Sequence, residues 1–266
     1  MELKVDYHIH TNCSDGELTP TQVVKKFKKE EYDVIAITDH DGVDGIKEAK
    51  IAGEAIELKV IQGVELSSIT EAGVNVHILG YNMDLENNEF IETLDELKEW
   101  RRDRNKVLIK KLNDLGYHVD IDEIYKAKGN DYIGKPDIAR YLLDKGMIAK
   151  MDDAFSSESG IYSKEEIENI TRKKLNIKDA INIIKNAKGI AVLAHPMKIK
   201  GIGEKGSDEF FLNLNNLVKD LKVEGLKGLE CYHPSASEDD SKKLVEFAEK
   251  YHLHITEGSD FHSENK

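Results

Sequence analysis

The chain has 266 residues, of which 39% are hydrophobic and 33% are charged. This length suits one large domain, or one domain that carries an insertion. The 51 acidic residues outnumber the 38 basic ones and give a net charge of −13, so long duplex nucleic acid would be repelled and a nucleic-acid scaffold is disfavoured. A small phosphorylated ligand stays compatible with this charge where bound cations reverse the field over a short range.

The two cysteines, Cys13 and Cys231, are not spaced as a Cys-x-x-Cys pair, so they indicate neither a disulfide framework nor a zinc ribbon. We interpret Cys13 as a buried thiol, although its place between His10 and Asp15 leaves a metal-ligand role open. Charged residues interrupt the first positions, where a signal peptide would need an apolar run, and no apolar run approaches membrane-spanning length. We therefore expect a cytoplasmic protein that does not bind a membrane.

The first regular pattern, over residues 5–10, predicts a β-strand. Apolar and polar side chains alternate there, and this period of two places the polar side chains on one face. Two imidazoles and the carboxylate of Asp15, just beyond the strand, are the kinds of group that hold a metal ion. The plain alternative is a half-buried strand whose polar groups are satisfied. The polar residues of the pattern are Asp6, His8 and His10.

Helices and strands then alternate along the chain. Thr19 and Gln22 suit the N-cap and N3 positions of a helix, and Pro20 suits its first turn. Continuous apolar runs predict buried parallel strands, so the region predicts a parallel α/β architecture. The predicted elements are helices at 20–31 and 45–57 and strands at 33–38, 59–64 and 74–81.

This alternation stops after the fourth strand. A helical pattern covers residues 88–115, and shorter helices are predicted at 120–126 and 135–144. We therefore predict a helical insertion at 99–170 that covers the active site of a barrel domain formed by residues 1–98 and 171–266. Arg101 and Arg104 lie one helical turn apart in the insertion. We interpret them as a solvated basic face, with a position facing the cavity as the alternative.

The alternation resumes in the last third of the chain and brings the number of predicted strands to seven. His195 follows one of these strands, Tyr232 and His233 end the next, and Asp260 and His262 follow the last. The predicted elements are helices at 177–187, 207–222 and 237–251 and strands at 189–194, 225–232 and 252–257.

Histidines and carboxylates recur at the ends of the predicted strands. The carboxyl ends of parallel strands face the active site in α/β sheets and barrels, so these side chains should meet. They are too many for one ion, and imidazole with carboxylate suits zinc, manganese or iron, with a bridging carboxylate between two ions. His77 fits less well because it lies within its strand. The set is His8, His10, Asp15, His40, Glu65, His77, His195, Asp260 and His262.

His252 and His254 have the same spacing as the first-strand pair but lie at the start of a strand. The start of a parallel strand is at the opposite end of a barrel from the site, so we interpret both as structural or solvated. Asp6 and Asp39 are expected to orient neighbouring groups or to cap turns.

The ordered motifs together resemble the PHP (polymerase and histidinol phosphatase) family, and the resemblance runs through almost the whole chain. It implies a distorted (β/α)7 TIM-like barrel and a metal-dependent phosphoesterase with two to three divalent ions. The motifs are His8-x-His10 with Asp15, Thr38-Asp39-His40, Gly63-Val64-Glu65, His77, Leu193-Ala194-His195-Pro196 and Gly258-Ser259-Asp260-x-His262.

The resemblance also implies a ligand set for each ion and a mechanism in which a metal-activated hydroxide attacks phosphorus. Glu65 would bridge two of the ions. The implied sets are His8, His10, Glu65 and Asp260 for one metal, Asp15, His40 and His262 for a second, and Glu65, His77 and His195 for a third.

Within the family, the segment 133–140 resembles the branch that converts nucleoside 3′,5′-bisphosphates to 5′-nucleotides and trims short 5′-phosphorylated RNA. Lys135 stands where arginine is common in that branch; it keeps the charge but not the bidentate geometry. We expect Lys135 and Arg140 to bind the second phosphate, with helix ion pairs as the alternative for Arg140.

Tyr232 and His233 are expected to contact substrate. His233 is a candidate to bind phosphate or to protonate the leaving oxygen, and the equal alternative is a histidine that caps its loop.

Two other functions compete with this interpretation. One is a histidinol phosphatase, or a phosphatase of another small metabolite; the other is an inert metal-binding regulatory domain of the same fold. The chain ends soon after His262, earlier than the resemblance implies, so a final stabilising segment is expected to be missing. The sequence indicates neither the native metal nor the oligomeric state.

Overall fold

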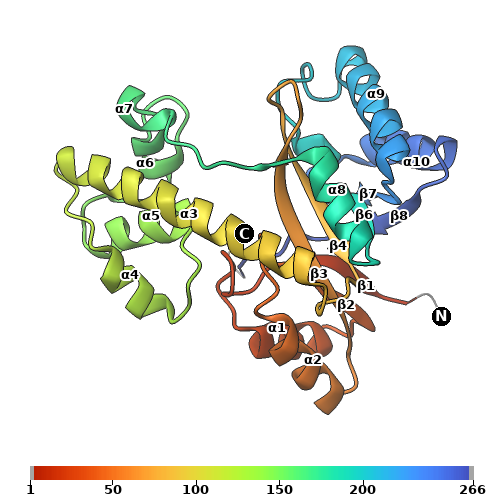
Figure 1. The fold of residues 1–266 in the computed structure, drawn as a ribbon, viewed down its shortest axis with the longest axis horizontal. Coiled ribbons are helices and arrows are strands. Elements are labelled where there is room, and N and C mark those ends of the chain that lie inside the picture. Colours follow the sequence, from red (N-terminus) through yellow and green to blue (C-terminus); the bar gives the residue numbers. More distant parts are fainter. Residues whose placement is uncertain (1–2, 264–266) are drawn as a thin grey trace. The chain divides into compact units, whose positions relative to one another are not determined.

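The computed structural model describes residues 3–263, and the chain divides into two compact units. Unit 1 comprises residues 1–94 and 174–266, and unit 2 comprises residues 95–173. The long helix α3 (Asn88–Asp114) begins in unit 1 and continues in unit 2 (Figure 1).

Unit 1 is built on one mixed sheet, in the order β1-β2-β3-β4-β6-β7-β8, with the two-residue β5 paired to β3. The seven strands along this order correspond to the seven expected from the sequence, and β5 is an addition. The strands are β1 (Val5–Ile9), β2 (Val34–Ile37), β3 (Lys59–Ile69), β4 (Asn75–Tyr81), β5 (Leu175–Asn176), β6 (Ile190–Leu193), β7 (Gly228–Tyr232) and β8 (His254–Glu257).

Neighbouring strands of the sheet are parallel except at β4, which runs antiparallel to both β3 and β6. The expectation of a purely parallel architecture is therefore wrong at this strand. The reason is local: Gly73 has a left-handed φ of 81° and allows a tight turn between β3 and β4, which joins the two strands as a hairpin. The amino-terminal half of β4 consequently lies at the rim that the other strands reach with their carboxyl ends.

The sheet curves until its first strand meets the segment that follows its last strand. Ile9 and Phe261 form a parallel bridge, and the amide of His10 donates to the carbonyl of Phe261 at 2.9 Å. The result is a nearly closed barrel, in which the red β1 and the blue β7 and β8 of Figure 1 belong to the same sheet. The distorted TIM-like barrel expected from the sequence is confirmed.

Helices of unit 1 begin where the sequence places capping residues. Thr19 accepts a hydrogen bond from the Gln22 amide at 3.2 Å, and the Gln22 side chain accepts one from the Thr19 amide at 2.8 Å, as a capping box requires. Ser237 forms a second capping box with Asp240, whereas Ser207 caps its helix by accepting the Phe210 amide alone. The helices are α1 (Pro20–Lys29), α2 (Ile46–Ala55), α8 (Ile177–Asn186), η2 (Pro196–Lys198), α9 (Asp208–Glu224) and α10 (Glu238–Lys250).

The helices bury one side of the sheet. Val23, Val24 and Phe27 of α1 are almost fully buried against Ile35 and Ile37 of β2. Burial of such side chains stabilises the barrel by roughly 1.5–3 kcal/mol each. The rim therefore stands on a rigid framework.

Unit 2 contains helices and no strand, and the structure describes all of its residues. Its own core includes Leu108 and Leu112 of α3, Ile138 of α5 and Ile167 of α7, all fully buried. A separate core explains why this segment forms a compact unit of its own. Beyond α3, its helices are α4 (Ile121–Lys128), α5 (Lys135–Asp144), α6 (Asp152–Phe155), η1 (Ile161–Ser163) and α7 (Glu165–Glu168).

Within residues 3–263, every helix is too short or too polar to cross a membrane.

Candidate metal centre

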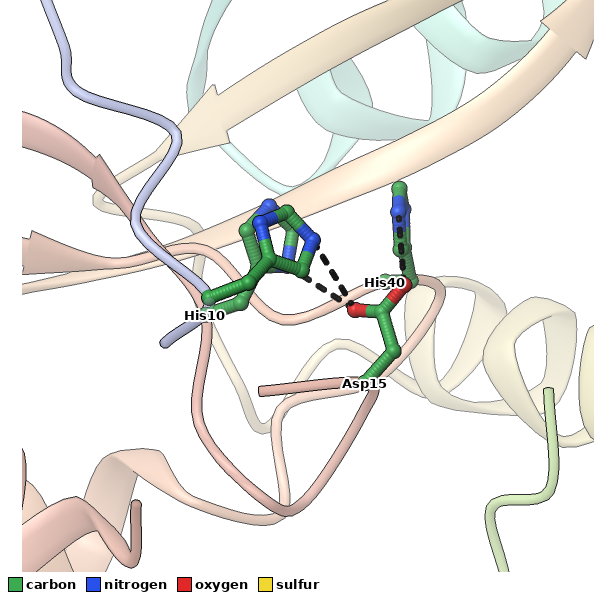
Figure 2. A group of neighbouring side chains, drawn as sticks. His10, Asp15 and His40 are labelled. Atoms are coloured by element: carbon green, nitrogen blue, oxygen red, sulfur yellow. Dashed lines mark ion pairs between the residues drawn. The ribbon is translucent and has the colours of Figure 1, made fainter. Parts of the chain in front are cut away.

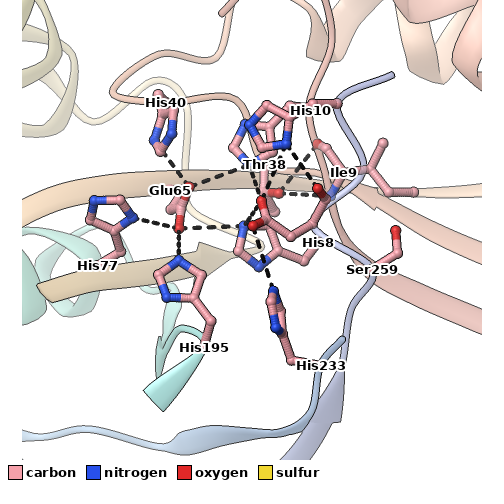
Figure 3. A network of polar contacts seen from close by, with 12 residues as sticks. His8, Ile9, His10, Thr38, His40, Glu65, His77, His195, His233 and Ser259 are labelled. Carbon is pink, nitrogen blue, oxygen red and sulfur yellow. Dashed lines mark hydrogen bonds and ion pairs between the residues drawn. The ribbon is translucent and has the colours of Figure 1, made fainter. Parts of the chain in front are cut away.

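Glu65 is the centre of the polar cluster at the rim of unit 1. It is 1% exposed, and its two carboxylate oxygens contact five imidazoles (Figure 3). Oε1 lies 2.8 Å from His195 Nε2, 2.9 Å from His77 Nδ1 and 3.4 Å from His8 Nε2. Oε2 lies 3.0 Å from His40 Nδ1 and 3.3 Å from His10 Nε2.

The arrangement of strands explains why these side chains converge. His8 lies near the carboxyl end of β1, and His40 and His195 follow β2 and β6. His77 lies near the start of β4, which reaches the same rim because that strand runs in the opposite direction. The sequence placed His77 in the set but could not show that strand reversal brings it there.

Two further carboxylates come from turns rather than from strands. Asp15 Oδ1 lies 3.3 Å from His262 Nε2 and 3.6 Å from His10 Nδ1, and its Oδ2 lies 3.7 Å from His40 Nε2 (Figure 2). Asp260 Oδ1 lies 3.2 Å from His10 Nε2 and 3.6 Å from His8 Nε2. All nine predicted metal ligands are thus brought together.

Three groups within the cluster have ligand atoms close enough to hold one ion each, because the atoms of each group lie within 4.8 Å of one another. The first resembles the predicted second set with His10 added, and the second is the predicted first set without Asp260. The third contains His40 where the prediction has His195. The groups are His10, Asp15, His40 and His262; His8, His10 and Glu65; and His40, Glu65 and His77.

The donor atoms fit divalent cations. His8 Nε2, His10 Nε2 and Asp15 Oδ1 are buried and have no hydrogen-bond partner among residues 3–263. A buried polar atom without a partner costs free energy unless another group satisfies it. Imidazole nitrogens and carboxylate oxygens together are the donor set that zinc, manganese and iron accept, so the side chains suit such an ion.

The carboxylates and imidazoles also shift one another's pKa. Burial lowers the pKa of His10, but Asp260 and Glu65 outweigh burial and raise it to about 10. Burial raises the pKa of Glu65, but His77, His40 and His8 hold it well below its ordinary range. A divalent cation that binds to these imidazoles would replace any proton on the nitrogen that it takes.

Other buried carboxylates hold the ligand segments in place. Asp39 accepts hydrogen bonds from the amide of Thr11 at 2.8 Å and from the hydroxyl of Ser14 at 2.5 Å, which fixes the turn that carries Asp15. Asp6 Oδ1 accepts hydrogen bonds from the amides of His8 at 3.0 Å and Ser259 at 3.1 Å. The orienting role expected for Asp6 and Asp39 is confirmed by these contacts.

Glu230 is a member of the site that the sequence interpretation did not include. It is fully buried in β7, its Oε1 lies 2.9 Å from His8 Nδ1, and its Oε2 accepts the His195 amide at 2.6 Å. Because a carboxylate only accepts, His8 Nδ1 donates, which leaves His8 Nε2 for a metal. The signal was available, since Glu230 precedes His233 on the same strand end.

The backbone is strained at two predicted ligands that follow their strands. His195 has a φ of 27° and Asp260 a φ of 53°, values that residues other than glycine rarely adopt. Such strain persists only where surrounding contacts fix the conformation, and it clusters at functional sites.

A cavity of about 300 Å³ opens beside the cluster. Ligand residues line it together with Lys198, whose Nζ forms an ion pair with Asp260 Oδ2 and whose side chain is 44% exposed. Lys198 gives the cavity a positive charge that the sequence analysis did not identify. The cavity suits a small anionic group.

The predicted substrate contacts lie in different parts of the chain. His233 Nδ1 accepts the Ser235 amide at 2.9 Å, so the proton of the neutral ring belongs on Nε2, which lies 3.5 Å from Asp260 Oδ2. The ring therefore caps its loop and also faces the cluster. Tyr232 is 50% exposed at the end of β7. Lys135 and Arg140 belong to α5 of unit 2.

Two expectations about other residues have opposite outcomes. His252 and His254 are exposed, as expected for residues at the start of β8. Arg101 and Arg104 are only 6% and 9% exposed, so the solvated basic face is wrong. The helical pattern showed that they share a face but not that other segments of unit 2 cover it.

We predict that Gly258→Ala weakens metal binding and lowers the melting temperature. A Cβ at residue 258 would lie 2.3 Å from His8 Cβ and 2.5 Å from Glu230 Oε1, far inside normal contact distance. Overpacking of this kind costs about 1–3 kcal/mol, and the shift would displace His8. Calorimetric melting and metal content per chain check both effects. Gly42→Ala is the matched control, because its Cβ would meet nothing closer than 3.5 Å; equal behaviour of the two variants would contradict the prediction.

Comparison with known proteins agrees with this geometry. The family model of the PHP domain matches residues 6–259. The chain is 31% identical over 262 residues to a 5′-3′ exoribonuclease of Haemophilus influenzae, covering 98% of this chain and 91% of the relative. It is 28% identical over 260 residues to a 3′,5′-nucleoside bisphosphate phosphatase of Chromobacterium violaceum, covering 97% of this chain and 87% of the relative.

The fold is similar to solved structures over the same length. An amidohydrolase from Chromobacterium violaceum, solved with bound sulfate and no metal, aligns with a TM-score of 0.85 at 28% identity. The alignment covers 98% of this chain and 88% of that one. Sequence and fold therefore agree on which proteins this chain is similar to.

Proposed function

Because this chain belongs to the PHP domain family and is a metal-dependent phosphoesterase, we propose that its substrate is a small phosphorylated nucleotide. The proposed reaction converts a nucleoside 3′,5′-bisphosphate to the 5′-nucleotide, and short 5′-phosphorylated RNA is the proposed second substrate. The observation that supports it most is the cluster around Glu65, in which six of the nine ligand-competent side chains line a small cavity. The names of two similar proteins, a bisphosphate phosphatase and an exoribonuclease, support the choice of substrate.

We propose that the nine side chains hold two to three divalent ions, with manganese, iron or zinc as candidates. When bound, such ions lower the pKa of a coordinated water and neutralise phosphate oxygens. Glu65 keeps the imidazoles around it in a fixed geometry, and Asp15 and Asp260 complete the ligand set at the two sides of His10. We assign each side chain to an ion as the family resemblance implies, and this assignment stays a prediction.

The remaining side chains act on the substrate itself. Lys198 places a positive charge at the cavity, where a phosphate oxygen would replace Asp260 as its partner. His233 presents Nε2 with its proton toward the cluster, which suits either a hydrogen bond to phosphate or protonation of the leaving oxygen. Contacts from Tyr232, and from Lys135 and Arg140 of unit 2, remain predictions.

A cytoplasmic location is proposed because both cysteines are free thiols. The net charge of −13 further supports a small substrate over long duplex nucleic acid.

We expect the manganese-loaded protein to release phosphate from adenosine 3′,5′-bisphosphate and to leave histidinol phosphate largely intact. A 5′-phosphorylated RNA trimer in the same panel tests the second substrate. Faster hydrolysis of histidinol phosphate would favour the rival metabolite phosphatase. No turnover of any substrate by protein that retains its metal would contradict the proposed function and favour an inert domain of this fold.

The same assay includes variants of the site. His40→Ala and Asp260→Ala should lose metal and activity together, because each contacts Glu65 or its neighbours directly. His252→Ala is the matched control, since this histidine is exposed and lies outside the cluster. Activity that survives both site substitutions would refute the assignment.

A further inference from the structure

Strand β1 is irregular at the residue that carries the first histidine of the metal centre. Between the pairs that Asp6 and Ile9 form with β2, the chain advances by three residues in β1 and by two in β2. One extra residue therefore lies in the segment of Tyr7 and His8, as in a β-bulge. A bulge interrupts the ladder of hydrogen bonds and changes the direction of the side chains near it. The direction of His8 consequently depends on the groups that fix this bulge.

Side chains bond to the backbone of the bulge. Besides the aspartate that accepts the His8 amide, the Thr38 hydroxyl accepts the Ile9 amide at 3.0 Å. The Tyr81 hydroxyl donates to the Tyr7 carbonyl, which directly precedes His8, at 2.7 Å. Backbone groups on both sides of His8 are thus held by side chains, and Tyr81 holds the carbonyl that comes before it.

Tyr81 reaches this carbonyl from another wall of the barrel. It is the last residue of β4, and β2 and β3 separate β4 from β1 in the sheet. Its side chain shares a face of β4 with His77, because successive side chains of a strand alternate. The ring is 6% exposed and belongs to a buried cluster with Val192 and Ala194 of β6. The side chain therefore crosses the barrel interior and connects the strand of His77 with the strand of His8.

The Tyr81 hydroxyl keeps its proton. Burial, and then the carboxylates of Glu230 and Asp6, raise the pKa of Tyr81 well above its ordinary value. A protonated phenol is a hydrogen-bond donor, and a buried donor that loses its acceptor is unfavourable. The bond to the Tyr7 carbonyl is therefore a permanent part of the folded barrel.

We propose that Tyr81 is a positioning residue of the metal centre, whose hydroxyl fixes the β1 bulge from across the barrel and so sets the direction of His8. It acts through the backbone of Tyr7 and not through contact with an ion or a substrate. Glu230 orients the His8 ring through Nδ1 at 2.9 Å, whereas Tyr81 fixes the backbone from which the ring projects. The proposal rests on His8 as a metal ligand and on no choice of substrate.

Calorimetric titration of the full chain with manganese tests the role of Tyr81. Tyr81→Phe keeps the ring and removes the hydroxyl. We expect at least one manganese ion to bind about 10-fold more weakly, the low end of the range for an outer partner of a metal-binding histidine, because Tyr81 acts through the backbone.

Tyr162→Phe is the matched control for this titration. Tyr162 is 7% exposed, and its hydroxyl also donates to a backbone carbonyl, that of Lys135, at 2.8 Å. It belongs to unit 2, whereas every predicted metal ligand belongs to unit 1. The control loses the same kind of buried hydrogen bond and should bind manganese like the wild type.

The visible absorption spectrum of the cobalt-substituted protein is a readout that a general loss of stability does not move. Its bands report the geometry of the ligands around the ion. We expect the spectrum of Tyr81→Phe to differ from that of the wild type, because His8 changes direction, and the spectrum of Tyr162→Phe to match it.

A second pair of variants applies if Tyr81→Phe does not fold. Thr38→Val removes the hydroxyl that accepts the Ile9 amide and should weaken manganese binding in the same way. Thr38→Ser keeps a hydroxyl and should restore the affinity. Wild-type affinity in Thr38→Val would then overturn the proposal.

Equal manganese affinity and equal cobalt spectra in the wild type and a folded Tyr81→Phe would overturn the proposal. An equal loss of affinity in Tyr81→Phe and Tyr162→Phe would overturn it as well, since the effect would not depend on the β1 bulge. A wild type that binds manganese but hydrolyses no substrate would refute the proposed function and leave the role of Tyr81 intact, because both readouts are taken without substrate.

Discussion

Glu65→Gln should remove metal binding and phosphate release together. The carboxylate is 1% exposed and lies within 3.4 Å of nitrogen atoms from five histidines, so it holds the cluster by charge as well as by coordination. An amide keeps the shape but loses the negative charge, and its NH₂ group faces imidazole nitrogens or cations. Because loss of an outer partner of a metal ligand already costs about 10- to 100-fold in affinity, loss of this ligand should cost more than about 100-fold.

Elemental analysis and phosphate release measured on the same preparation check this prediction. Glu71→Gln is the matched control: Glu71 lies beyond the end of the same strand, is largely exposed and pairs with Lys178 at 3.1 Å. It should keep wild-type metal content and turnover. Stoichiometric metal in Glu65→Gln would show that the histidines and remaining aspartates suffice, and that Glu65 is not a bridging ligand.

The sequence predicted the convergence of these side chains because their positions follow simple geometric rules. His8 and His10 share a face through the period of two, and His40, His195 and Asp260 follow apolar runs that could only be buried strands. Parallel pairing then brings the strand ends to one rim, as the structure confirms. His252 and His254 were separated from the site by the same rule, although their spacing matches that of the first pair.

The direction of a strand and the burial of a helix face could not be predicted from the sequence pattern. A run such as residues 74–81 predicts a strand but not its direction. Only the structure shows that β4 is antiparallel and so brings His77 to the rim. The burial of Arg101 and Arg104 depends on segments of unit 2 that follow them by 28 residues or more, such as Ile133, which accepts from Asn105 at 2.9 Å. Charge on a helix face predicts solvation only when no other segment covers that face.

Glu230 shows a third limit, because its role lies in two hydrogen bonds to groups from other strands. Its position on β7 was visible in the sequence, but its partners, His8 of β1 and the His195 amide after β6, are more than thirty residues away. One carboxylate thus joins three strand ends. If Glu230 orients the His8 ring rather than only filling space, a substitution that keeps its size should still weaken metal binding.

Glu230→Gln should weaken metal binding about 10- to 100-fold without unfolding the protein, the range expected for an outer partner of a metal-binding histidine. Glutamine has the same size, but it offers one acceptor oxygen where Glu230 uses two, for His8 Nδ1 and for the His195 amide. One of these bonds must be lost, and with it either the orientation of the His8 ring or the strained turn at His195. Metal titration followed by calorimetry measures the affinity, and melting of the metal-free protein measures stability.

Asp6→Asn is the matched control: Asp6 is also buried beside His8, but a single oxygen accepts both of its amide hydrogen bonds, so asparagine can keep them. If both variants bind metal equally tightly, Glu230 does not set the orientation of His8.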